Sequence, residues 1–69
     1  MIGIFKTNIA TLHDKNRVID AVSGQFAATD CTLDLEDCDR VLRVICQQLE
    51  EEHVVSFVCS LGFRCEVLD

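Results

Sequence analysis

The residues best suited to chemistry in this chain are five cysteines, Cys31, Cys38, Cys46, Cys59 and Cys65. Their number is odd and no two are separated by two residues, so they match neither a disulfide framework nor a standard zinc spacing. In a reducing cytosol such cysteines stay thiols. Cys31 and Cys65 alternate with charged residues, which indicates small core residues, and we expect Cys59 to be at least partly packed.

A metal site is one use for the thiol of Cys38. His13, Cys38 and a neighbouring carboxylate would form a zinc or cobalt ligand set, since imidazole, thiolate and carboxylate all bind such ions. Only one thiol is available there and no short spacing ties it to His13, which favours the simpler interpretation of a solvated histidine beside an acidic turn. Cysteine catalysis would also need a base within reach, and the sequence places neither histidine beside a cysteine. An enzyme is therefore the least favoured function.

Two acidic clusters could suggest calcium, namely DLEDCD at 34–39 and EEE at 50–52. Neither has the D-x-D-x-D-G spacing of a calcium-binding loop. The first is typical of a hairpin turn, and the second complements the positive end of a helix.

The charge of the chain excludes several classes of partner. Its 69 residues include 12 acidic and 6 basic side chains, for a net charge of −6, with no Trp or Tyr. Nucleic-acid binding depends on clustered basic residues and on aromatic stacking, so we expect no nucleic-acid partner. The chain shows no export signal, and its most apolar run, HVVSFVCSLGF, is shorter than the roughly 20 residues that span a bilayer. We therefore expect a cytoplasmic protein with no membrane partner.

The hydropathy pattern predicts one domain, residues 1–69, with six elements. Strands are expected at 2–7, 31–36, 40–46 and 63–69, and helices at 12–25 and 47–61. The hydroxyl of Thr11 can cap the first helix, and Gly62 can end the second. This order of elements predicts an α+β ferredoxin-like fold, βαββαβ, in which two helices cover one face of a four-stranded antiparallel sheet. A permuted α+β sandwich is the alternative.

The uncovered face of that sheet is the candidate interaction surface. If Ile2 and Ile4 face the helices, Phe5 faces away from them. The candidate interface then consists of four apolar residues, Phe5, Val41, Ile45 and Leu68. Apolar patches of this kind can mark association surfaces, although more than half of any protein surface is apolar. A homodimer is the commonest outcome, and an unknown protein partner is the alternative.

Four segments of the chain resemble the heavy-metal-associated domains of copper chaperones. They are IGIF at 2–5, VIDAVS at 18–23, TLDLEDCDRVLRV at 32–44 and LGFRCEVL at 61–68. The last is similar to the glycine-aromatic turn that precedes the final strand of that family. The resemblance covers nearly the whole chain and implies the same ferredoxin-like fold.

In that family the loop after the first strand carries M-x-C-x-x-C, whose thiolates bind a soft cation such as Cu(I). Aligning the first helix places Lys6 at the methionine, and Asn8 and Thr11 at the two cysteines. None of these is a soft ligand, so we expect no cofactor. The leading hypothesis is a small, non-enzymatic interaction module of the cytosol whose metal loop has degenerated. The alternative is a divergent Cu(I) or zinc binding or transport protein that uses Cys38 and His13.

Overall fold

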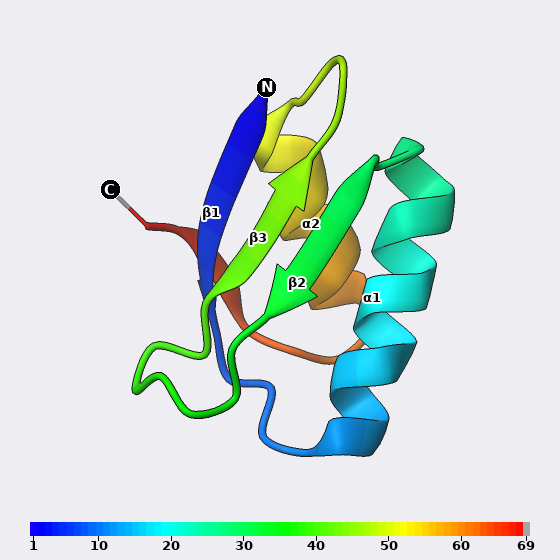
Figure 1. Cartoon of the computed structure of the whole chain (residues 1–69). Coiled ribbons are helices and arrows are strands. Elements are labelled where there is room, and N and C mark those ends of the chain that lie inside the picture. The colour runs from blue at the N-terminus through cyan, green and yellow to red at the C-terminus, as the bar shows by residue number, and fades with distance from the viewer. Residues whose placement is uncertain (69) are drawn as a thin grey trace.

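The computed structural model describes residues 1–68, which form two helices and one four-stranded sheet. The elements are β1 (Ile2–Thr7), α1 (Leu12–Phe26), β2 (Asp30–Leu33), β3 (Leu42–Ile45), α2 (Glu51–Ser60) and β4 (Cys65–Val67). The strands lie in the order β2-β3-β1-β4, and all neighbouring pairs are antiparallel. Both helices lie on one side of the sheet (Figure 1). The predicted α+β ferredoxin-like fold is confirmed.

Local signals account for the ends of both helices. The Asp14 backbone N–H donates to Thr11 Oγ1 at 3.1 Å, so Thr11 caps α1 as predicted. Gly62, just beyond α2, has φ of +101°, a left-handed conformation that glycine adopts without steric cost. Such a residue commonly follows the last turn of a helix.

The two largest boundary errors, at the start of α2 and at the end of β2, arise because packing and side-chain hydrogen bonds override the helix and strand patterns. Strands β3 and β4 also begin later than predicted, at Leu42 rather than at 40 and at Cys65 rather than at 63. The second helix begins at Glu51 rather than at 47, and Leu49 in the preceding segment is only 9% exposed. Strand β2 ends at Leu33 rather than at 36. Beyond it, Asp34 Oδ1 accepts a hydrogen bond from the Glu36 backbone N–H at 2.9 Å, a local bond that favours a turn over a continued strand.

The facing of β1 is the reverse of the prediction. Gly3, Phe5 and Thr7 are buried on the helix side, whereas Ile2 and Ile4 are 49% and 36% exposed on the other side. The inner position of residue 3 is crowded, since a Cβ added to Gly3 would lie 2.5 Å from Leu49 Cδ2. Only the smallest residue fits there.

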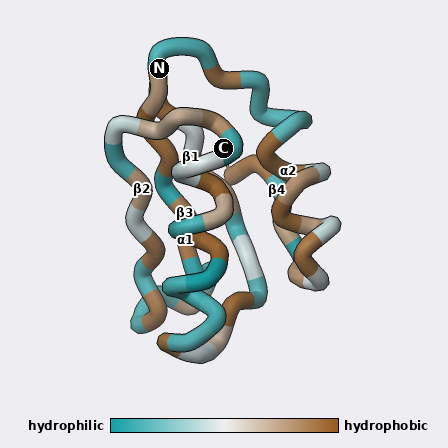
Figure 2. Tube along the Cα trace, turned by 90° about the vertical axis from the view of Figure 1, so that its right-hand side faces the viewer, coloured by the Kyte–Doolittle hydropathy of each residue, from teal (hydrophilic) through white to brown (hydrophobic). Residues whose placement is uncertain are grey.

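The core fills the space between the inner face of the sheet and the helices. Its fully buried side chains are Phe5, Ile9, Val18, Val22, Leu42, Val44, Val54 and Val58. The rings of Phe26 and Phe57 join α1 to α2 in an edge-to-face contact, with centroids 5.5 Å apart. Along α2, hydrophobic and hydrophilic residues are interspersed, as expected for a helix with one buried side (Figure 2). Within residues 1–68, no helix has both the length and the apolar composition needed to cross a membrane.

Candidate functional site

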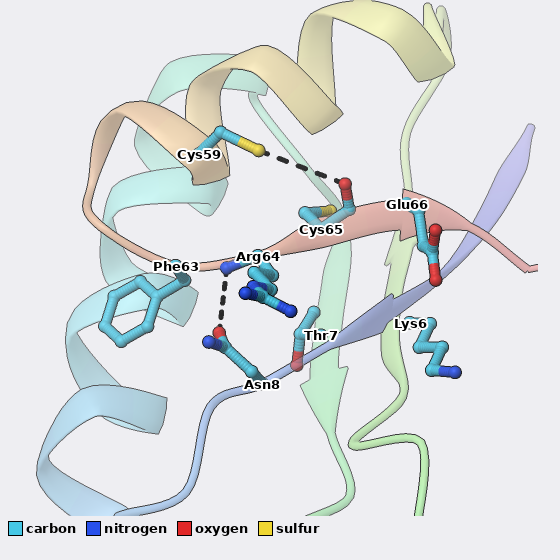
Figure 3. A pocket seen from close by; sticks show the side chains of 8 residues that line it. All are labelled: Lys6, Thr7, Asn8, Cys59, Phe63, Arg64, Cys65 and Glu66. Carbon is cyan, nitrogen blue, oxygen red and sulfur yellow. Dashed lines mark hydrogen bonds between the residues drawn. The ribbon is translucent and has the colours of Figure 1, made fainter.

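The three positions that the resemblance aligns with metal ligands all have structural partners. Asn8 Oδ1 accepts a hydrogen bond from the Arg64 backbone N–H at 2.8 Å, which ties the loop after β1 to the segment before β4 (Figure 3). Lys6 Nζ lies 3.7 Å from Asp39 Oδ1, and Thr11 caps α1. The polar atoms at these positions hold the loop in place, and none of them belongs to a thiol.

The loop between β2 and β3 contains the other candidate ligand, Cys38. Its Sγ and one carboxylate oxygen each from Asp37 and Asp39 lie within 4.8 Å of one another, the one such group of three found in residues 1–68. His13 does not belong to this group and is exposed in the first turn of α1. Both carboxylates have partners within the protein. The Asp39 N–H donates to Asp37 Oδ1 at 2.7 Å, and Asp39 pairs with Lys6.

A surface hollow of about 500 Å³ lies between the end of α2, strand β4 and the end of β1 (Figure 3). It is lined by Lys6, Thr7, Asn8, Cys59, Phe63, Arg64, Cys65 and Glu66. Two of the five cysteines therefore border one space. The Cys59 thiol lies 3.9 Å from the Cys65 carbonyl oxygen. Cys59 is exposed, contrary to the expected partial packing, and Cys65 is 8% exposed.

Burial raises the pKa values of two of the five thiols. The pKa of Cys65 is raised to about 12, first by burial and then by the negative charges of Cys59 and Glu66. Burial also raises the pKa of Cys31, aided by Asp30 and opposed by a hydrogen bond with Ser23. Because the thiolate is the reactive form, both thiols are weak nucleophiles near neutral pH.

Within residues 1–68, no helix covers the outer face of the sheet (Figure 1), and this face carries an apolar strip. Ile2 pairs with Ile45 in register, and the Leu68 N–H donates to the Ile4 carbonyl at 2.9 Å. Because side chains alternate along a strand, these four residues share the outer face. We call them the outer strip: Ile2, Ile4, Ile45 and Leu68.

The predicted interface is corrected at one of its four residues. Phe5 is 0% exposed and belongs to the core, so it cannot contact a partner. Val41, Ile45 and Leu68 are each partly exposed, and their role in an interface stays a prediction. Lys6 was the signal that could have corrected the facing of β1, since it is in phase with Ile2 and Ile4 and a lysine favours the solvent side.

The proximity of Cys59 to Cys65 was missed entirely. A separation of six residues matches no metal or redox spacing. The one available signal was Gly62, which stands three residues from each cysteine and permits the turn that brings α2 back to β4.

In comparisons with known proteins, the chain matches no protein-family model, no curated protein and no solved structure. The likeness to heavy-metal-associated domains rests on the four sequence segments and stays a prediction. The fold class rests on the strand order itself.

Proposed function

We propose that this protein is a small, non-enzymatic interaction module of the cytoplasm that binds a second copy of itself through the outer face of its sheet. The observation that supports this function most directly is the outer strip, in which Ile2 and Ile4 remain 49% and 36% exposed. Contiguous exposed apolar residues on an uncovered face are typical of association surfaces.

The charges around the outer strip support a second copy as the partner. Exposed basic residues lie on the two central strands, with Lys6 on β1 and Arg43 on β3. Exposed acidic residues lie on the two edge strands, with Asp30 on β2 and Glu66 on β4. A face that is basic at its centre and acidic at both edges can meet a copy of itself with opposite charges opposed when the two-fold axis lies between the centre and one edge, so that the central strands of each copy face an edge strand of the other. This local pattern offsets the repulsion between two chains of charge −6.

Sedimentation velocity over a concentration series tests this function. We expect the wild type to dimerise and Ile4→Glu to remain a monomer, because a charge would be buried at the centre of the interface. Leu12→Glu is the matched control, since Leu12 is 63% exposed on α1 and lies outside the outer face. Circular dichroism checks that both variants fold. A wild type that stays monomeric up to about 1 mM, the weak end of measurable affinity, would contradict the proposal.

A divergent metal site is a second candidate, supported by the close grouping of Asp37, Cys38 and Asp39. Thiolate and carboxylate together suit zinc, and the thiol alone suits Cu(I). Titration of the reduced protein with each ion against a competing chelator is the direct test, with Cys38→Ala and His13→Ala as variants. Binding weaker than micromolar that Cys38→Ala does not change would remove this candidate.

A further inference from the structure

Cys59 and Cys65 are brought together by the turn between α2 and β4. The Gly62 N–H donates to the Cys59 carbonyl at 3.0 Å, and the left-handed φ of Gly62 reverses the chain. The Cys59 thiol then points towards the Cys65 backbone, 3.9 Å from its carbonyl oxygen (Figure 3). Residues from the last turn of a helix and from the first position of an edge strand thus meet in one hollow.

The two thiols differ in access. Cys59 is exposed to solvent, whereas Cys65 is 8% exposed and lies against the core. A soluble oxidant can therefore reach Cys59 more readily than it can reach Cys65. This asymmetry suits a pair in which one thiol meets the oxidant and the other completes the reaction.

We propose that Cys59 and Cys65 form an oxidation site, which a small anionic disulfide such as glutathione disulfide converts to an intramolecular disulfide. In the first step the Cys59 thiolate attacks one glutathione sulfur and expels the other glutathione as a thiolate. In the second step Cys65 loses its proton to solvent and its thiolate attacks the Cys59 sulfur, expelling the second glutathione. Two protein thiols are oxidised, and one glutathione disulfide is reduced to two glutathiones.

The charges of the hollow favour this oxidant. Lys6 and Arg64, two of the six basic residues of an acidic chain, line the hollow beside the thiol pair. Glutathione disulfide carries a net negative charge, so the basic side chains attract it to Cys59. Glu66 also lines the hollow, and Lys6 forms an ion pair with Asp39, with 3.7 Å between Nζ and Oδ1. Arg64 is therefore the residue whose charge is most available to the oxidant.

The disulfide would join α2 to β4, which pairs on one side only, with β1. The Cys59 sulfur lies 3.9 Å from the Cys65 carbonyl oxygen, so forming the bond requires the Cys59 side chain to turn from that oxygen towards the Cys65 sulfur. An edge strand of three residues would then be held by a covalent bond as well as by its hydrogen bonds to β1.

The test is incubation of the reduced full chain in glutathione buffers of increasing oxidised fraction, followed by acid quenching, alkylation and tryptic mapping. Trypsin cleaves after Arg43 and Arg64, so Cys59 and Cys65 fall in separate peptides, 44–64 and 65–69. We expect these peptides to become linked, with the mass of two hydrogen atoms lost from the protein. Fragmentation distinguishes Cys59 from Cys46, which shares its peptide.

Variants separate the two steps. Cys65→Ala should stop at a glutathione adduct on Cys59, and Cys59→Ser should give no link between the two peptides. Cys38→Ser is the matched control that removes another exposed thiol and should oxidise as the wild type does. A wild type that accumulates only the Cys59 adduct, or that links Cys59 to other cysteines as often as to Cys65, would overturn the proposal.

The second step has a pH signature. Burial, the largest cause of the raised pKa of Cys65, persists in the adduct, so conversion of the adduct to the disulfide should accelerate by about tenfold per pH unit from neutral pH upward. The charged groups near this thiol are Glu66, Lys6 and Arg64, and the charge of Cys59 is absent once it carries glutathione. A closing rate that levels off near pH 9, the ordinary pKa of a thiol, would assign the second step to a less buried cysteine.

Discussion

The two faces of strand β1 differ in a way that hydrophobicity alone does not explain. The inner face carries Gly3, Phe5 and Thr7, and the outer face carries Ile2, Ile4 and Lys6. The buried set contains a glycine and a threonine, whereas the exposed set contains two isoleucines. Steric fit and hydrogen bonding decided which face was buried. The apolar residues left outside are the ones available to a partner.

The largest contrast between the faces should appear when Phe5 and Ile4 are each changed to alanine. Phe5→Ala should lower the free energy of unfolding by about 3–5 kcal/mol, because it leaves a cavity in the core. Ile4→Ala should change it by about 0.5 kcal/mol or less, as an outer-face substitution in the monomer. Urea unfolding at low protein concentration measures both. Equal losses would break the distinction between the two faces.

Gly3→Ala tests whether the inner face is crowded. Its new Cβ would lie 2.5 Å from Leu49 Cδ2 and 2.7 Å from Phe5 Cε2, so the free energy of unfolding should fall by about 1–3 kcal/mol. Gly24→Ala is the matched control within α1, where a Cβ meets nothing within 4 Å. This control should stabilise the protein by about 0.5–1 kcal/mol. If both variants were stabilising, the close packing at Gly3 would be disproved.

Thr7→Val tests the hydrogen bonds of the inner face at nearly constant volume. The Thr7 hydroxyl donates to the Arg40 carbonyl at 2.6 Å and accepts from the Ile9 N–H at 3.3 Å. Its loss leaves buried backbone groups unpaired and should cost about 1–3 kcal/mol. Lys6→Gln on the outer face removes only an exposed ion pair and should cost about 1 kcal/mol or less. Thermal unfolding of the two variants gives the comparison.

The smallest expected effect on the free energy of unfolding at neutral pH is that of Cys65→Ala. Cys65 pairs with Thr7 in register on the inner face. Its pKa is raised from 9.0 to about 12, so between these values the unfolded chain holds fewer protons than the folded one. The free energy of unfolding should therefore fall as pH rises above about 9. Chemical denaturation between pH 8 and 11 should show a shallower decline in Cys65→Ala. An unchanged slope would mean that another group causes the alkaline loss.

Much of the fold could be predicted because its signals are local. The Thr11 cap and the Gly62 turn depend on residues within one turn of each helix, and the alternation of β2 and β3 depends on neighbouring residues. Element order then predicted the topology. The boundary at 47 could not be predicted in this way, because Leu49 acts through packing onto β1. The boundary at 36 was missed for another reason, since the local hydrogen bond from the Glu36 N–H to Asp34 Oδ1 competes with the alternating strand pattern.

The candidate site was less predictable, because it depends on which residues the fold brings together. The roles of Asn8 and Lys6 as structural residues became visible only through their partners, Arg64 and Asp39, which lie 56 and 33 positions away in sequence. The position of Cys38 beside two carboxylates could be predicted, because Asp37 and Asp39 are its neighbours in sequence. That His13 lies outside this group could not be predicted, because it depends on the fold.

By itself, the sequence determined the order of the elements, the helix cap at Thr11, the turn at Gly62 and the absence of thiols from the first loop. These depend on residue type and on contacts between near neighbours. Only the tertiary structure decided that Phe5 is buried and Ile4 exposed, and that Cys59 meets Cys65 in one hollow. The reason is that a strand's alternation allows either face to be buried, and packing against the helices selects between them.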